Sequence, residues 1–133
     1  MHTKGFSYYV PAILWGLAIF IGSSIPSHAV PSAVLKFSDL LLHFLEFTIL
    51  GICLAYAFLH SPDRVQLKWL LIAAFVGTLY GASDELHQRF VNGRVSSFTD
   101  FLADSAGVLF GILLFFVVPR LFNLRNVKSA AEQ

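Results

Sequence analysis

The stretch that decides the fold is Tyr80–Arg94, YGASDELHQRFVNGR, which overlaps the end of an uncharged run of 15 residues, Trp69–Ser83. Fifteen helical residues rise only about 22 Å, whereas a hydrocarbon core of about 30 Å needs about 20 residues. A helix that crosses a membrane here must therefore continue through Asp84, Glu85 and Gln88. Ionisable groups at membrane depth are costly and usually face a protein interior. The stretch therefore predicts a helical bundle with a polar interior.

The composition of the whole chain is that of a membrane protein. Of its 133 residues, 56% are hydrophobic and only 13% are charged, which is too apolar for an ordinary soluble domain. We expect a single domain over residues 1–133, because the chain has no room for a second. The single cysteine, Cys53, excludes an intrachain disulfide framework. No basic patch with interleaved aromatic residues supports nucleic-acid binding.

Four apolar segments predict an all-α fold, a four-helix transmembrane bundle. We expect spans at about residues 8–25, 40–59, 68–88 and 100–119. Turn residues separate them, with Pro26 after the first span and Asn92-Gly93 after the third.

The placement of Lys and Arg predicts the orientation of the bundle. Six of these residues lie on the side that holds both termini, and three lie on the other side. The six are Lys4, Arg64, Lys68, Arg120, Arg125 and Lys128, and the three are Lys36, Arg89 and Arg94. Both termini are therefore expected in the cytoplasm, with the polar segment facing outward. One alternative is cleavage of a signal peptide after Ser27-His-Ala29, which would leave three spans and invert the C-terminus.

Polar residues of three spans are expected to meet near the outer leaflet. Asp39, His43 and Glu46 of the second span follow an i, i+4, i+7 spacing, which puts them on one helical face. Asp100 and Asp104 of the fourth span lie one turn apart on one face. Together with the acids and the amide of the third span, they predict a polar site at a single depth.

Two glycines continue the stripe of the fourth span inward. Gly107 and Gly111 lie one turn apart, and small residues at this spacing are typical of a close helix–helix contact. The contact is expected within the bundle or, alternatively, with a neighbouring chain in an oligomer.

The predicted site has an excess of acids. Its six carboxyl groups outnumber the three cations on the same side of the membrane. The acids are Asp39, Glu46, Asp84, Glu85, Asp100 and Asp104. Like charges in a low-dielectric site cannot all stay ionised. We therefore expect compensation by protons, a protonated histidine, a bound metal or a cationic ligand.

Three motifs in the chain match a known family. They are Ser23-Ser24-x-Pro26, then Asp39-x-x-x-His43-Phe44-x-x-Phe47, then Ser83-Asp84-Glu85-x-x-Gln88-x-Phe90-x-x-Gly93-Arg94, which continues to Asp100 and Gly107. In these motifs the chain resembles the VanZ-like family of small bacterial integral membrane proteins. The resemblance covers nearly the whole chain and implies a multi-pass protein of the bacterial inner (cytoplasmic) membrane. The founding member is linked to teicoplanin resistance, and the resemblance supplies no molecular mechanism.

The chain departs from the family pattern at two positions. Phe47 stands where the pattern has Tyr, and Asp104 stands where it has Asn. The first departure removes a hydroxyl group from the predicted site, and the second adds a carboxylate.

Purely structural roles compete with a functional site. Asp39 and Asp100 are good helix N-cap residues, and Ser97 with Asp100 forms a loose capping box. Arg94 can pair with Asp84 or Asp100 and so pin the outer loop to the bundle.

Our first hypothesis is a binding protein that engages an envelope component, such as a lipid-linked one, and contributes to glycopeptide resistance. Arg94 would hold a phosphate or carboxylate, for which its fork geometry is suited. The remaining binding residues would be Asp39, Asp84, Gln88, Asp100 and Asp104. The lipid bilayer is the expected environment.

The alternative is a membrane-embedded enzyme acting on a lipid-linked envelope substrate. Glu85 or Glu46 would be the general acid or base, and His43 or His87 would relay a proton. Proton-coupled transport ranks lower, because the inner half of the bundle offers almost no polar residue. Ligand types for a metal are present but no HExxH or comparable spacing is, so the sequence predicts no metal site and assigns no cofactor.

Overall fold

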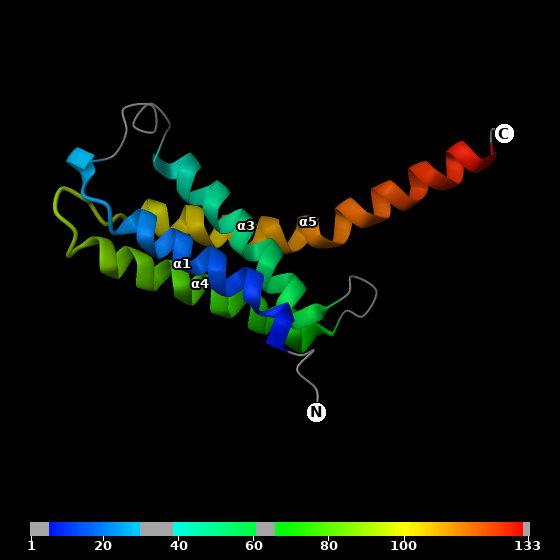
Figure 1. Cartoon of the computed structure of the whole chain (residues 1–133), viewed down its shortest axis with the longest axis horizontal. Helices are drawn as coiled ribbons and strands as arrows, with labels where there is room; N and C mark the ends of the chain where they lie inside the picture. The colour runs from blue at the N-terminus through cyan, green and yellow to red at the C-terminus, as the bar shows by residue number, and fades with distance from the viewer. Residues whose placement is uncertain (1–5, 30–38, 61–65, 132–133) are drawn as a thin grey trace.

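The computed structural model describes residues 6–29, 39–60 and 66–131, with side chains described as far as Arg120. Within these ranges the chain is all-helical and contains no strand. The elements are η1 (Phe6–Tyr8), α1 (Val10–Ser23), η2 (Ser27–Ala29), α3 (Asp39–Leu59), α4 (Leu67–Gln88) and α5 (Phe98–Ala131). Figure 1 shows α1, α3, α4 and the first part of α5 as a bundle, from which the C-terminal part of α5 extends away.

The four predicted spans correspond to the four long helices, so the predicted all-α, four-helix fold is confirmed for the described part of the chain. Three helical stretches are long and apolar enough to cross a membrane: Phe6–Ser23, Asp39–Leu59 and Phe98–Arg120. Helix α4 is less apolar than these three stretches, and its last two turns carry Asp84, Glu85 and Gln88. These two turns are helical, so the predicted continuation of the helix through Asp84, Glu85 and Gln88 is confirmed. The cytoplasmic location of the termini stays a prediction.

The predicted orientation also uses three residues beyond the described ranges. Lys4, Lys36 and Arg64 lie outside the described residues. We call the end of the bundle that carries the α4–α5 loop, residues 89–97, the polar end. The charge distribution predicts that the polar end faces outward.

Helices α3 and α5 form the closest pair, because glycines let their backbones touch. A Cβ at Gly107 would overlap the carbonyl oxygen of Phe44, and one at Gly111 would overlap that of Thr48. The predicted close contact is therefore confirmed, and it lies inside the bundle. The alternative of an oligomer formed through the Gly107/Gly111 face is corrected, because α3 occupies that face.

Helix α4 packs on the same core through small residues. A Cβ at Gly77 would lie 2.6 Å from Cγ1 of Val108, and one at Gly81 would lie 2.9 Å from Cβ of Asp104. Phe47 and Val108 are fully buried in the core between the helices. The glycines of α4 thus bring α5 close and set Asp104 against α4 near the polar end.

Helix α1 is attached to the bundle by a few side chains. The indole Nε1 of Trp15 donates to the carbonyl oxygen of Glu46 at 2.8 Å, and the hydroxyl of Tyr80 donates to that of Gly16 at 2.6 Å. Much of the remaining surface of α1 is apolar and exposed, as at Leu14, which is 62% exposed. Extended apolar surface of this kind is typical of a membrane-contacting face.

The α4–α5 loop folds back on the segment that follows α1. Gly93 has a φ of +77°, a left-handed conformation that glycine adopts without steric cost, so the predicted Asn92-Gly93 turn is confirmed. The backbone N–H of Ser27 donates to the carbonyl oxygen of Asn92 at 3.3 Å. The loop therefore holds the ends of α1 and α4 together at the polar end.

Candidate functional site

The polar residues singled out in the sequence gather at the polar end, and α3, α4 and α5 each contribute. Six of them are buried, two are partly buried and one is exposed. The buried residues are His43, Asp84, Glu85, Gln88, Asp100 and Asp104, the partly buried ones are Glu46 and Arg94, and the exposed one is Asp39. The structure therefore brings most of these residues to one end of the bundle, while their functional roles stay a prediction.

Three of the buried residues form a compact group, which we call the buried triad: His43, Glu85 and Asp104. Nδ1 of His43 lies 2.8 Å from Oδ1 of Asp104 and 3.8 Å from Oε1 of Glu85. Asp104 is completely buried, and the other two residues are at most 6% exposed. Each member comes from a different helix, so the triad exists only when α3, α4 and α5 are packed together.

Several carboxylate oxygens around the triad have no hydrogen-bond partner in the described part of the chain. They are Oε1 of Glu85, Oδ2 of Asp104 and Oδ1 of Asp84. The other oxygens are engaged: Glu85 accepts the backbone N–H of Ser97 at 2.8 Å, and Asp84 accepts the amide N–H of Gln88 at 2.8 Å. Buried polar atoms normally have partners. The arrangement therefore suits a species that supplies protons or positive charge.

A second set of ligand-type atoms lies beside the triad. Asp39, His43 and Asp100 offer atoms that all lie within 4.8 Å of one another. This set shares His43 with the triad and includes the exposed Asp39, so it leads from the triad to the surface. Asp39 and Asp100 lie in the first turns of α3 and α5. In α5 the capping hydroxyl is that of Ser97, which accepts the backbone N–H of Thr99 at 3.1 Å.

The buried acids have no Lys or Arg partner among the described residues. The ion pairs found there are both made by His43, with Glu85 and with Asp104. Four carboxyls are buried at this end, those of Asp84, Glu85, Asp100 and Asp104, and the only ion-pair partner of any of them among the described residues is the imidazole of His43. Burying an uncompensated ion costs several kcal/mol, so protons or a bound cation must neutralise part of this charge.

Arg94 does not pair with Asp84 or Asp100, and this structural expectation is corrected. Its Nε donates to the carbonyl oxygen of Ile25 at 3.2 Å, and its Nη2 donates to that of Gly22 at 3.1 Å. The last carbonyls of a helix lack intrahelical donors, so the end of α1 offers acceptors that sequence spacing does not locate. Arg94 does pin the loop to the bundle, but through α1 and not through an acid.

Glu46 does not join the buried triad. Its side chain forms no hydrogen bond or ion pair with other described residues, and its carbonyl oxygen accepts the indole of Trp15 in α1. Nδ1 of His43 is directed to Asp104 instead. Of the predicted acid–base residues, the structure therefore groups Glu85 and His43 and leaves Glu46 apart.

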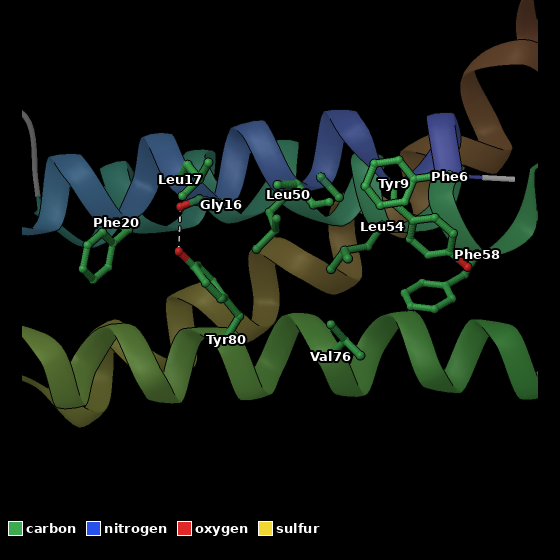
Figure 2. A pocket seen from close by; sticks show the side chains of 12 residues that line it. Phe6, Tyr9, Gly16, Leu17, Phe20, Leu50, Leu54, Phe58, Val76 and Tyr80 are labelled. Carbon is green, nitrogen blue, oxygen red and sulfur yellow. Dashed lines mark hydrogen bonds between the residues drawn. The ribbon is translucent and has the colours of Figure 1, made fainter. Parts of the chain in front are cut away.

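An apolar groove of about 690 Å³ lies between α1, α3 and α4 (Figure 2), and sequence analysis missed it. Its lining includes Leu17, Phe20, Leu50, Leu54, Val76 and Tyr80. Leu17 and Phe20 are 52% and 48% exposed, so the groove opens to the surroundings of the bundle. The lining residues have the same apolar character as the rest of the spans, so no hydropathy pattern distinguishes them.

His87 lies where the groove meets the polar end. Its ring lies against that of Phe20, with centroids 4.6 Å apart, and its Nε2 lies 3.0 Å from Oγ of Ser24. The expected proton relay between His87 and the acids is not supported by this position, because His87 faces α1. No spacing in the sequence indicates this contact between α4 and α1.

Fold and site together define a small all-helical membrane protein with a buried acidic cluster at one end of its bundle. A model of the family described as VanZ/LLP1 matches residues 8–119. The chain belongs to this family, and the resemblance seen in its motifs is confirmed. The comparison with curated proteins and the comparison with solved structures each gave no match.

The two departures from the family pattern have different structural consequences. Phe47 is completely buried, with its ring centroid 6.1 Å from that of Tyr80, so its ring fills core space. Asp104 belongs to the buried triad, and its Oδ1 lies 2.8 Å from Nδ1 of His43. The carboxylate at position 104 therefore gives the buried triad its second acidic side chain.

Proposed function

We propose that the protein binds a lipid-linked component of the cell envelope, with the lipid chain in the apolar groove and an anionic head group at the polar end. The observation that carries this proposal is the position of the groove, which reaches Phe20 two residues before the Gly22 carbonyl that Arg94 contacts. An amphiphile lying along α1 would place its head group beside Arg94.

The groove has the size and lining that a lipid chain needs. Ligand pockets in proteins usually have volumes of about 300–1,000 Å³ and are mostly apolar, and 690 Å³ lies within this range. The polar group of Tyr80 is already paired with the carbonyl oxygen of Gly16, as the dashed line in Figure 2 shows. A hydrocarbon chain beside Tyr80 therefore meets a hydroxyl that is already paired.

The polar end offers donors for a phosphate or carboxylate. A guanidinium group has five N–H donors, and Arg94 uses two of them, one on the carbonyl oxygen of Gly22 in α1 and one on that of Ile25, which follows α1. The remaining donors of Arg94 are free to bind an anion in the bidentate manner typical of arginine. Asp84 and Gln88, hydrogen-bonded to each other at 2.8 Å, provide acceptors for hydroxyl or amine groups of the head group.

Such binding would contribute to glycopeptide resistance by engaging wall components that are carried on lipids. Teicoplanin susceptibility of a sensitive Gram-positive host expressing the wild type, Glu85→Gln or Arg94→Ala, at equal membrane levels, tests this role. Protection by the wild type alone supports a function of the polar end. Equal protection by all three contradicts it.

The binding itself is tested by native mass spectrometry of the protein with a polyprenyl phosphate and with the corresponding polyprenol. The proposal predicts that the phosphate binds more tightly than the alcohol, and that Arg94→Ala removes this preference. Leu17→Trp fills the groove and should weaken both ligands at least about tenfold. Leu14→Trp is the matched control, because Leu14 has similar exposure on the same helix but does not line the groove.

Two results would contradict the binding proposal. Equal affinity for the phosphate and the alcohol would remove the head-group site. Equal behaviour of the Leu17→Trp and Leu14→Trp variants would remove the groove as the binding site for the lipid chain.

A second candidate function is an enzyme acting on the same class of lipid-linked substrate. The observation in its favour is the 2.8 Å contact of His43 with Asp104, since a base oriented by a carboxylate is a recurring element of catalytic sites. Glu85 would then be the general acid or base. Overexpression that alters the profile of wall precursors, and loses this effect with Glu85→Gln, would support an enzyme; unchanged profiles would argue for binding alone.

A further inference from the structure

We infer that the buried triad His43, Glu85 and Asp104 is a binding site for one divalent transition-metal ion, with zinc as the best match. The three residues offer one imidazole nitrogen and two carboxylate oxygens, all within 4.8 Å of one another. These are ligand types that zinc accepts, and three protein ligands with an open fourth position are typical of catalytic zinc sites. The inference does not depend on the lipid proposal.

The unpartnered oxygens are an independent indication of a ligand. Oε1 of Glu85 and Oδ2 of Asp104 are buried and have no hydrogen-bond partner among the described residues. Both belong to residues that are at least 94% buried. A buried carboxylate oxygen that accepts no hydrogen bond is rare, and a cation is the species that would satisfy both oxygens at once.

The spacing of the ligand atoms fits a tetrahedral ion. Bonds of about 2.1 Å at the tetrahedral angle separate neighbouring ligand atoms by roughly 3.4 Å. Nδ1 of His43 lies 2.8 Å from Asp104 and 3.8 Å from Glu85, so the distances fall on either side of this value. These distances involve Oε1 of Glu85 and Oδ1 of Asp104, and all three ligand atoms of the set lie within 4.8 Å of one another.

The charge balance also favours a divalent ion. Two carboxylates with a neutral imidazole carry two negative charges, which a divalent cation neutralises. The imidazole selects against Ca²⁺, which takes six to eight oxygen ligands, and Mg²⁺, which prefers an octahedral oxygen shell. Imidazole with carboxylate suits zinc and its neighbours in the first transition row.

The surroundings support a metal site in two further ways. The backbone N–H of Ser97 holds Oε2 of Glu85 at 2.8 Å, a contact of the kind that orients metal ligands. Asp39 and Asp100 form the second ligand-type set, which shares His43 and reaches the surface. Asp39 and Asp100 would thus provide a route by which an ion reaches the triad from the surface.

This inference revises the sequence-based prediction that no metal site is present. That prediction relied on the absence of a local motif such as HExxH. The three ligands come from three helices, and their separations along the chain carry no recognisable spacing.

Zinc binding to full-length, tag-free protein tests the inference. The protein is purified in detergent, stripped with a chelator and titrated with Zn²⁺ in competition with a chromophoric chelator, and zinc is counted by elemental analysis. We expect one zinc per chain in the wild type. Asp104→Asn keeps the side-chain size and the contact with His43, and should weaken binding at least about 100-fold, since loss of even a second-shell partner costs about 10–100-fold. The matched control His28→Gln removes an exposed histidine and should change the affinity less than twofold.

The wild-type protein alone can overturn the inference, whether or not the variants fold. A zinc content below roughly a tenth of an ion per chain would overturn the inference. X-ray absorption of the zinc-loaded wild type should show one imidazole and oxygen ligands at about 2.0–2.2 Å. A sulfur ligand, or a shell without imidazole, would place the ion elsewhere. Equal loss of affinity in the Asp104→Asn and His28→Gln variants would also exclude the triad.

Discussion

Replacing Gly111 by alanine should destabilise the bundle by a predictable amount. The added Cβ would overlap the carbonyl oxygen of Thr48 and lie 2.9 Å from the backbone nitrogen of Ile52. Overpacking costs about 1–3 kcal/mol, and this case belongs at the upper end because backbone atoms cannot rotate away. Alanine regains about 1 kcal/mol of helix propensity over glycine. The net loss in the free energy of unfolding is therefore about 2 kcal/mol.

A matched substitution isolates the effect of the close contact. A Cβ at Gly22 meets nothing within 4 Å, so Gly22→Ala should be neutral or stabilising by up to about 1 kcal/mol. The free energies of unfolding of the two variants, measured in mixed detergent micelles, should thus differ by about 2–3 kcal/mol. Equal stability of Gly111→Ala and Gly22→Ala would refute the α3–α5 packing on which the buried triad depends.

Three further predictions concern α1, the polar end and the orientation. Tyr80→Phe loses the 2.6 Å hydrogen bond to the carbonyl oxygen of Gly16 and should lower the free energy of unfolding by about 0.5–1.5 kcal/mol; an unchanged value in the same assay would mean that this bond does not hold α1. Arg94→Lys keeps the charge but cannot reproduce two donors in one plane, so it should lose about 1–3 kcal/mol of stability, and full stability would show that the fork geometry is unnecessary. In a cysteine-free background, Phe90→Cys should react with a membrane-impermeant maleimide on intact cells, whereas Lys128→Cys should react only after permeabilisation; the opposite pattern would invert the orientation.

The helices and their small-residue contacts could be predicted from the sequence because they depend on local periodicity. The length of the third span required a helix through Asp84 and Glu85, and α4 extends to Gln88. The spacing of Gly107 and Gly111 predicted a close contact. Spacing alone did not identify the partner helix, which only the packed structure shows to be α3.

The candidate site could be predicted only in part, because helical spacing fixes a face but not the neighbour that the face meets. The convergence of His43, Glu85 and Asp104 followed from their faces and shared depth. The partners of Arg94 did not, because backbone carbonyls at the end of a helix leave no mark in the side-chain pattern. The apolar groove was missed for a similar reason, since its shape depends on how α1 is set against α3 and α4.

The attachment of α1 has a consequence for the groove, because the contacts that hold this helix come from three separate segments. The groups that hold this helix are the carbonyl of Glu46, the hydroxyl of Tyr80 and the guanidinium of Arg94, and all of them are synthesised after it. Helix α3 supplies one of these contacts, while α4 and the loop that follows it supply the other two, so the full attachment of α1 requires all of these segments to be packed. Weakening any one of these contacts should therefore loosen α1 and widen the groove that it lines together with α3 and α4.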